Sequence, residues 1–152
     1  MAIKVIILLP FVLTACEKAV LPDKQQGNVT LTFSVTQSDR PTRGTVTIGD
    51  YFSKLNVMLF DADGAKVFDK VRTQLATDDD FGTLSAALQA GTYTVVAVGH
   101  SSAVSATIKS PQMVQFTAKD GQKLTDTFCY CGEVTIGNTP EQFQLKMHRV
   151  CA

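Results

Sequence analysis

Tryptophan, tyrosine and histidine are scarce in this sequence of 152 residues, which contains no tryptophan, three tyrosines and two histidines. Glycan sites usually display aromatic platforms, so the composition disfavours a protein of that class. Neither His100 nor His148 stands beside a glycine-flanked serine or a carboxylate pair at motif spacing. The sequence therefore predicts that the protein is not an enzyme and needs no cofactor.

An excess of charge of one sign is also missing, because 14 basic residues balance 14 acidic ones. A protein that binds nucleic acid or anionic lipid through charge usually carries a basic excess. No nucleic-acid partner is predicted.

A long hydrophobic run is absent as well. The apolar stretch Val5–Leu13 is nine residues long and contains Pro10, whereas a helix needs about 20 apolar residues to span a bilayer. A basic start at Lys4, a short apolar centre and small residues at its end are typical of a secretory signal. Residues 1–15 are therefore predicted to be a signal peptide and are excluded from the fold.

The end of this segment is more specific. Leu13-Thr14-Ala15-Cys16 resembles the bacterial lipobox, in which cleavage precedes a cysteine that carries a diacylglycerol. The alternative is an ordinary secretory signal with a chance cysteine. One acyl chain gives only marginal membrane binding, but the three chains of a mature lipoprotein, palmitate among them, anchor firmly. Cys16 is predicted to be the lipidation site, with residues 16–27 as a polar tether at the outer membrane.

Four cysteines leave an odd number once Cys16 is assigned to lipid. Cys129 and Cys131 lie in a predicted strand, where residues two apart point the same way at a spacing too long for a disulfide. They are interpreted as small buried hydrophobic residues. A zinc site with His148 and Cys151 is the less favoured alternative, because structural zinc sites usually show tighter paired spacing. No metal is predicted.

Most of the chain after the tether has a hydrophobic period of two, which indicates half-buried strands. No long helical period appears. Strands are predicted at residues 28–36, 54–60, 65–71, 83–88, 92–98, 113–118, 127–136 and 142–150. Residues 77–80 and 101–110 are predicted to be loops. Short strands separated by turns predict an all-β domain over residues 28–148, an antiparallel two-sheet sandwich of the prealbumin-like or immunoglobulin-like type.

Two turns have testable details. DADG at residues 61–64 predicts a hairpin into the segment AKVFDKV. Its carboxylates, and those of residues 78–80, suggest calcium as a weaker alternative, because the full ligand loop is missing. In the segment LQAGTYTV, Gly91 is expected to adopt a positive φ, while Tyr93 packs its ring at the sandwich end and directs its hydroxyl to the backbone.

Six segments in order carry a family resemblance: the lipobox cysteine, NVTLTFSV, YFSKLNVMLFDADGAKVF, LSAALQAGTYTVVAVGHS, TDTFCYCGEVTI and FQLKMHRVCA. Together they resemble the FimB-type fimbrillin-A associated anchor family of type V fimbriae. The resemblance implies a surface-exposed lipoprotein of the outer membrane, anchored through Cys16, that anchors or caps a fimbria. Pilin subunits would be its partners, and strand pairing at a sheet edge would join them.

Two alternatives to the anchor role stay open. A surface glycan-binding lipoprotein is one. A stalk or tip pilin is the other, because such subunits are thought to be cleaved by an arginine-directed protease. In SDRPTRGTV, Arg43 precedes Gly44 in a predicted exposed loop, whereas Arg40 precedes Pro41 and is a poor site.

The last segment of the sequence has no turn, glycine or polar tail. Residues 149–152 are therefore interpreted as the start of a truncated linker or second domain, which family members continue. We expect the first domain to close without it, because the apolar strands lie before this point. Normal fimbria attachment by this single domain is not expected.

Overall fold

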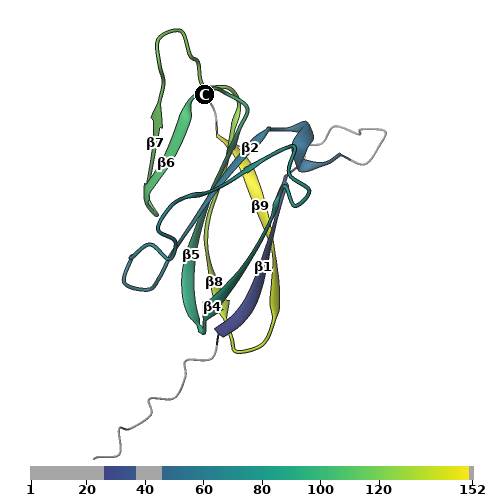
Figure 1. The fold of residues 1–152 in the computed structure, drawn as a ribbon, viewed down its shortest axis with the longest axis vertical. Helices are drawn as coiled ribbons and strands as arrows, with labels where there is room; N and C mark the ends of the chain where they lie inside the picture. The colour runs from purple at the N-terminus through teal and green to yellow at the C-terminus, as the bar shows by residue number, and fades with distance from the viewer. Residues whose placement is uncertain (1–25, 37–45, 151–152) are drawn as a thin grey trace, which may run out of the picture.

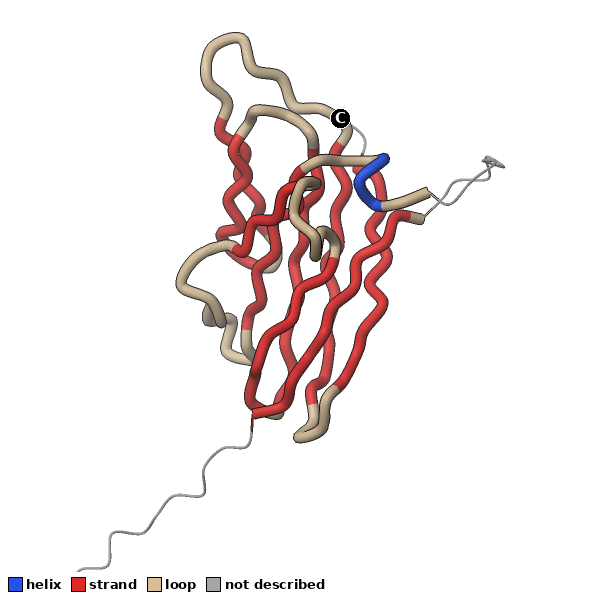
Figure 2. The backbone as a smooth tube through the Cα atoms, turned by 45° about the vertical axis from the view of Figure 1, so that its right-hand side comes forward, coloured by secondary structure: helices blue, strands red, loops and turns tan. Residues whose placement is uncertain are grey.

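The computed structural model describes residues 26–36 and 46–150, and this part of the chain is built of strands with one short 3-10 helix (Figures 1 and 2). The strands are β1 (Gln26–Val35), β2 (Lys54–Phe60), β3 (Arg72–Leu75), β4 (Thr83–Gln89), β5 (Gly91–His100), β6 (Ser105–Ser110), β7 (Met113–Thr117), β8 (Thr127–Ile136) and β9 (Glu141–Val150); the helix is η1 (Ile48–Asp50). The all-β class that the period-two pattern predicts is confirmed.

The strands form one seven-stranded sheet, in the order β3-β2-β5-β8-β9-β1-β4, and a separate two-stranded sheet, β6-β7. β1 pairs with β9 in parallel over Val29–Val35 and Glu141–Met147. The expectation of two purely antiparallel sheets is therefore wrong. A parallel pair needs a long crossover, and here nearly the whole domain lies between its two strands.

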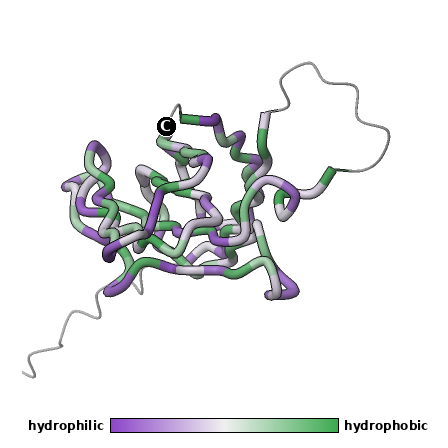
Figure 3. Tube along the Cα trace, turned by 90° about the horizontal axis from the view of Figure 1, so that it is seen from above, coloured by the Kyte–Doolittle hydropathy of each residue, from purple (hydrophilic) through white to green (hydrophobic). Residues whose placement is uncertain are grey.

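The seven-stranded sheet curls, so that its two halves face each other across one core. Seen from above, hydrophobic and hydrophilic residues alternate along much of the chain, as half-buried strands require (Figure 3). On one half, β1 contributes Val29, Leu31 and Phe33. On the other half, β2 contributes Leu55, Val57 and Leu59, and these side chains pack in the same cluster. The core thus lies inside the curl.

A second, smaller core lies on the outer face of β2 and β5, where the β6-β7 hairpin covers it. Met58, Phe60, Val96 and Val98 alternate with the residues of the main core and pack against Ile108 of the hairpin. This explains why β2 reads as apolar on both faces. The molecule therefore has three layers.

Two segment predictions need correction, and one strand, β3, was not predicted. AKVFDKV is not a strand: it forms only an isolated bridge between Phe60 and Lys66, and the partner of β2 is the later β3. Residues 105–110, predicted to be loop, form β6. Both strands are short and have few fully buried residues, so their hydrophobic alternation is weak. The remaining predicted strands are observed, with ends shifted by no more than two residues.

The corner between β4 and β5 differs in one respect from its prediction. Tyr93 is buried and its hydroxyl donates to the carbonyl oxygen of Gln89 at 2.8 Å, as expected. Gly91, however, is not among the positive-φ glycines, which in the described residues are Gly64, Gly82 and Gly121. Gly91 is simply the first residue of β5. The expected backbone role of Gly91 is therefore wrong.

The DADG turn is stabilised by its own aspartate. The Oδ1 atom of Asp61 accepts hydrogen bonds from the backbone N–H of Asp63 at 3.0 Å and of Ala65 at 2.8 Å. Gly64 supplies the positive φ, at 79°. These contacts show that Asp61 and Gly64 serve to form the turn.

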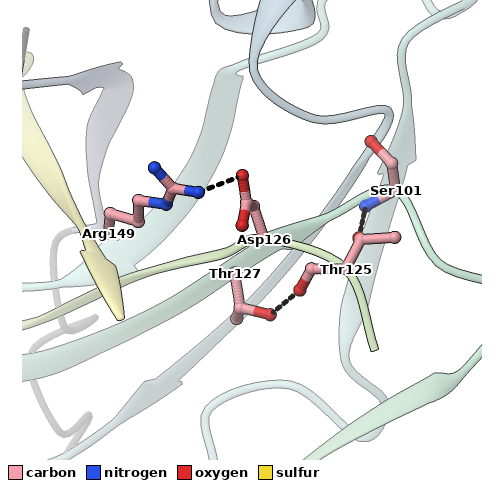
Figure 4. A network of polar contacts seen from close by, with 5 residues as sticks. All are labelled: Ser101, Thr125, Asp126, Thr127 and Arg149. Atoms are coloured by element: carbon pink, nitrogen blue, oxygen red, sulfur yellow. Dashed lines mark hydrogen bonds and ion pairs between the residues drawn. The ribbon is translucent and has the colours of Figure 1, made fainter. Parts of the chain in front are cut away.

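Polar contacts also fix the segment that leads into β8 (Figure 4). The backbone N–H of Ser101 donates to Oγ1 of Thr125 at 3.1 Å, and Oγ1 of Thr127 donates to the carbonyl of Thr125 at 3.0 Å. Arg149 of β9 forms an ion pair with Asp126. Both charged side chains are more than half exposed, so the hydrogen bonds rather than the ion pair are expected to hold this segment.

The two glycines of β5 make a matched test of this fold. A Cβ on Gly99 would lie 2.4 Å from the ring of the fully buried Phe52, whereas a Cβ on Gly91 would meet the Tyr93 ring at an ordinary 3.7 Å. We expect Gly99→Ala to lower the free energy of unfolding by about 1–3 kcal/mol through overpacking. Gly91→Ala should leave it nearly unchanged. Denaturant unfolding checks both, and a large loss in Gly91→Ala would show that Gly91 has the strained backbone first expected.

Candidate functional site

The curl of the large sheet brings one of its edges, β4, close to the chain between β2 and β3. A groove of about 700 Å³ lies between them. One wall is β4 from Leu84 to Gln89, and the opposite wall includes Val67, Phe68 and Arg72. The sheet is therefore open along this line, because β4 pairs only with β1.

A glutamine from β3 contacts the start of β4, next to the Leu84 end of the groove. The side-chain amide of Gln74 donates to the carbonyl of Thr83 at 2.6 Å, and its oxygen accepts from the N–H of Gly82 at 3.0 Å. Gln74 is 7% exposed. A buried amide that bonds to the backbone in both directions replaces a strand partner at this point. β3 and the start of β4 are thereby joined through a side chain.

The other end is closed by Tyr93. Its hydroxyl donates to the carbonyl of Gln89, the last residue of β4. Burial first, and then the negative charge of Asp61, raise the pKa of the Tyr93 hydroxyl. The hydroxyl is thus kept protonated and able to donate.

Charged groups stand at different points along the groove. Asp61 lies near Tyr93, because Phe60 pairs with Thr94. Arg72 pairs with Val57 and lies nearer the Gln74 end. The Arg72 guanidinium sits 4.8 Å from the centre of the Phe68 ring, which holds the cation over an apolar wall. The groove therefore has a negative end at Asp61 and a positive end at Arg72.

A buried polar chain lies elsewhere, on the outer face of β2 and β5. Thr73 donates to Oδ1 of Asn56 at 2.9 Å, which leaves the amide nitrogen of Asn56 to donate to Nε2 of His100 at 3.4 Å. Nδ1 of His100 then carries the proton and donates to Oγ of Ser102 at 2.9 Å. Burial, followed by the charge of Lys54, lowers the pKa of His100. His100 is a neutral structural residue in this arrangement.

Two predicted site residues lie outside the described residues: the lipidation site Cys16 and the protease site Arg43. The geometry of this structure therefore bears on neither of them. Both stay predictions.

The cysteines of β8 are both free, as their spacing predicts. Cys129 is half-buried, and burial raises the pKa of its thiol. Cys131 is exposed, so the expectation that both are buried is wrong for Cys131. Cys129 is the cross-strand partner of His148. Within residues 26–36 and 46–150, however, no three side chains of His, Cys, Asp or Glu converge as a metal ion would require.

No helix in the described part of the chain combines the length and apolar character needed to cross a membrane.

Fold and groove together define the class of protein: an all-β protein built on a curled sheet with an open edge. The profile of the family of fimbrillin-A associated anchor proteins Mfa1 and Mfa2 matches residues 14–149. The chain therefore belongs to this family, as the order of its motifs predicts. The family comprises fimbrial anchor proteins and not enzymes, and it implies a location at the cell surface or in the envelope.

Three solved structures are similar to this chain, and the two with a TM-score above 0.5 share its fold. A candidate adhesin of Bacteroides thetaiotaomicron has a TM-score of 0.59 at 15% identity, covering 85% of this chain and 47% of that one. A candidate polysaccharide-binding protein of the same organism has a TM-score of 0.52 at 12% identity, with 81% and 47% covered. The fimbrial anchor protein Mfa2 of Porphyromonas gingivalis has a TM-score of 0.49 at 18% identity, with 82% and 50% covered.

The chain thus spans about half the length of these three proteins. Among curated protein sequences, none matches.

The groove was not predicted from the sequence. The two side chains at its ends, Gln74 and Tyr93, are far apart in the chain and come from different strands. For Tyr93 a signal exists, because the turn motif predicts a backbone contact for its hydroxyl. For Gln74 none does, since the strand that carries it was itself missed.

The buried histidine predicts how stability changes with pH. The folded state disfavours protonation of His100, so the unfolded chain binds more protons as the pH falls below about 6.5. Stability contributed by this residue is fully present above that pH and is lost progressively below it. We expect the free energy of unfolding to fall between pH 7.5 and 5.5 by more in the parent than in His100→Gln. Equal pH profiles for the parent and His100→Gln would contradict the assignment.

Proposed function

We propose that this chain is a lipid-anchored fimbrial subunit of the outer membrane, which anchors or caps a fimbria by pairing strands with pilin subunits. The family match over residues 14–149 carries the proposal. The protein acts as a structural partner and not as an enzyme in this proposal.

The position of the first strand supports a membrane anchor at one end. β1 begins at Gln26, ten residues after Cys16. In Figure 1, β1 begins and β9 ends at opposite ends of the molecule. Lipid on Cys16 would hold the end of the domain where β1 begins against the membrane, and the opposite end would face outward.

The open edge of the large sheet supports assembly by strand pairing. Unpaired backbone groups along an edge strand are satisfied when another chain adds a strand. Natural proteins usually protect such edges, so an accessible one beside a groove favours an interaction role.

The glycan-binding alternative has less support. All three tyrosines lie in the described residues, where Tyr93 is buried and Tyr51 and Tyr130 are half-buried. The exposed large hydrophobic residues of the described chain are Leu75, Met113, Leu124 and Val150, and none is aromatic. A stalk or tip role stays a secondary proposal, with cleavage at Arg43 as its distinguishing event.

Replacing the lipidated cysteine tests the anchor. Cys16→Ser should move the protein from the detergent phase to the aqueous phase in phase partitioning and should block cleavage after Ala15. Cys131→Ser, which removes an exposed thiol elsewhere, is the matched control and should partition like the parent. Equal detergent partitioning of Cys16→Ser and the parent would refute the lipoprotein proposal.

Attachment itself is tested in a bacterium that lacks its own fimbrial anchor. The parent chain and Cys16→Ser are expressed, and fimbrial protein is measured in the membrane fraction and in the medium. We expect partial retention: more fimbrial protein should co-fractionate with membranes that carry the parent chain than with membranes of the Cys16→Ser strain, but less than with the bacterium's own anchor. Complete shedding in both strains would contradict an anchoring role for this chain.

A further inference from the structure

Hydrogen bonds at the two ends of β4 reveal which of its backbone groups face the groove. The N–H of Thr83 donates to the carbonyl of Asp80, and the carbonyl of Thr83 accepts from Gln74. One residue earlier, the carbonyl of Gly82 instead accepts a hydrogen bond from the N–H of Phe33 of β1. In an antiparallel pair, hydrogen-bonded and non-hydrogen-bonded residues alternate. Thr83 is therefore a non-hydrogen-bonded position with respect to β1.

The same alternation continues along the strand. It places the N–H and C=O of Ser85, Ala87 and Gln89 on the outer edge, away from β1. Two observations agree with this register. The carbonyl of Gln89 accepts from Tyr93, and the hydroxyl of Ser85 lies 3.4 Å from that of Thr30, its cross-strand partner, as side chains do at close non-hydrogen-bonded pairs.

Gln74 and Tyr93 thus occupy the outer edge at its two ends, and the backbone groups of Ser85 and Ala87 lie between them without a strand partner in the described residues. From Thr83 to Gln89 the strand covers about 20 Å at roughly 3.3 Å per residue. The open stretch is therefore suited to a short strand of about five residues.

We propose that the outer edge of β4 is the acceptor for an extended strand from a fimbrial subunit, which enters the groove and pairs with the backbone of Ser85 and Ala87. This rests on the proposed function and names the edge that pairs. The strand would satisfy the open donors and acceptors while its alternate side chains pack on Val67 and Phe68.

Charge in the groove defines the chemistry of the entering strand. Arg72 near the Gln74 end favours an acidic side chain, and Asp61 near the Tyr93 end favours a basic one. Opposite charges at the two ends select the direction of the strand and its register, because the reversed strand would place like charges together. The partner segment is therefore a short apolar strand with charges of opposite sign at its ends.

A proline at the centre of the edge tests this proposal. Ala87→Pro removes an N–H that faces the groove and is not needed for pairing with β1, so the fold should persist with a nearly unchanged melting temperature. Ala87→Ser keeps the N–H and is the control. The probe is the major fimbrial subunit purified from the same bacterium, with the full chain in detergent. Binding by Ala87→Pro should be at least about tenfold weaker than binding by the parent or Ala87→Ser.

Hydrogen exchange on the parent gives a second readout that needs no variant. The amides of Ser85 and Ala87 should exchange rapidly in the free protein and become protected when the fimbrial subunit binds. Binding with neither protection nor a proline effect would overturn the assignment to β4 and leave the anchor function intact. No binding by the parent chain would overturn both. Protection of these amides at high concentration of the chain alone would show that a second copy, and not a pilin, is the occupant.

Discussion

The rest of the structure depends on the double pairing of β9. Over Glu141–Met147 this strand pairs in parallel with β1, and over His148–Val150 it pairs antiparallel with β8. A single strand that serves both halves forces the sheet to turn around it, and the turn brings the apolar faces of the halves together. Leu145 and Met147 lie at this turn and are buried in the shared core. Without this link, the β1-β4 pair would have no hydrogen-bonded neighbour in the sheet.

A sheet that curls in this way must either close or leave two edges, and this one leaves them open. At one end a side chain rather than a strand joins the two edges, since Gln74 of β3 bonds to Thr83 of β4. At the other end Tyr93 of β5 bonds to the last residue of β4. Backbone pairing between the two edges would have required β3 to extend past Arg72. Instead the chain from residue 61 to residue 71 forms a turn and an irregular segment, and the groove exists because that segment is not a strand.

The sequence predicts the long strands well because each carries its own alternating pattern, and β2 and β8 were predicted with their observed ends. It fails where stability comes from a partner far away in the chain. β6 has one fully buried residue, Ile108. The apolar residues that Ile108 packs against lie on β2 and β5, far away in the chain. The parallel pairing of β1 with β9 has no local signal either, because alternation defines the faces of a strand and not the identity of its neighbour.

Gly91 and Gln74 show the same limit at single residues. A glycine in a turn motif suggests a special backbone, yet Gly91 is ordinary and it is Gly99, on the same strand, that Phe52 requires to have no side chain. A glutamine in a short polar stretch suggests a solvated loop, yet Gln74 is buried because two backbone groups beside β4 lack any other partner. Both roles follow from close contacts between segments distant in sequence. The edge that we assign to a pilin strand is defined by such contacts, and it was therefore accessible only from the folded structure.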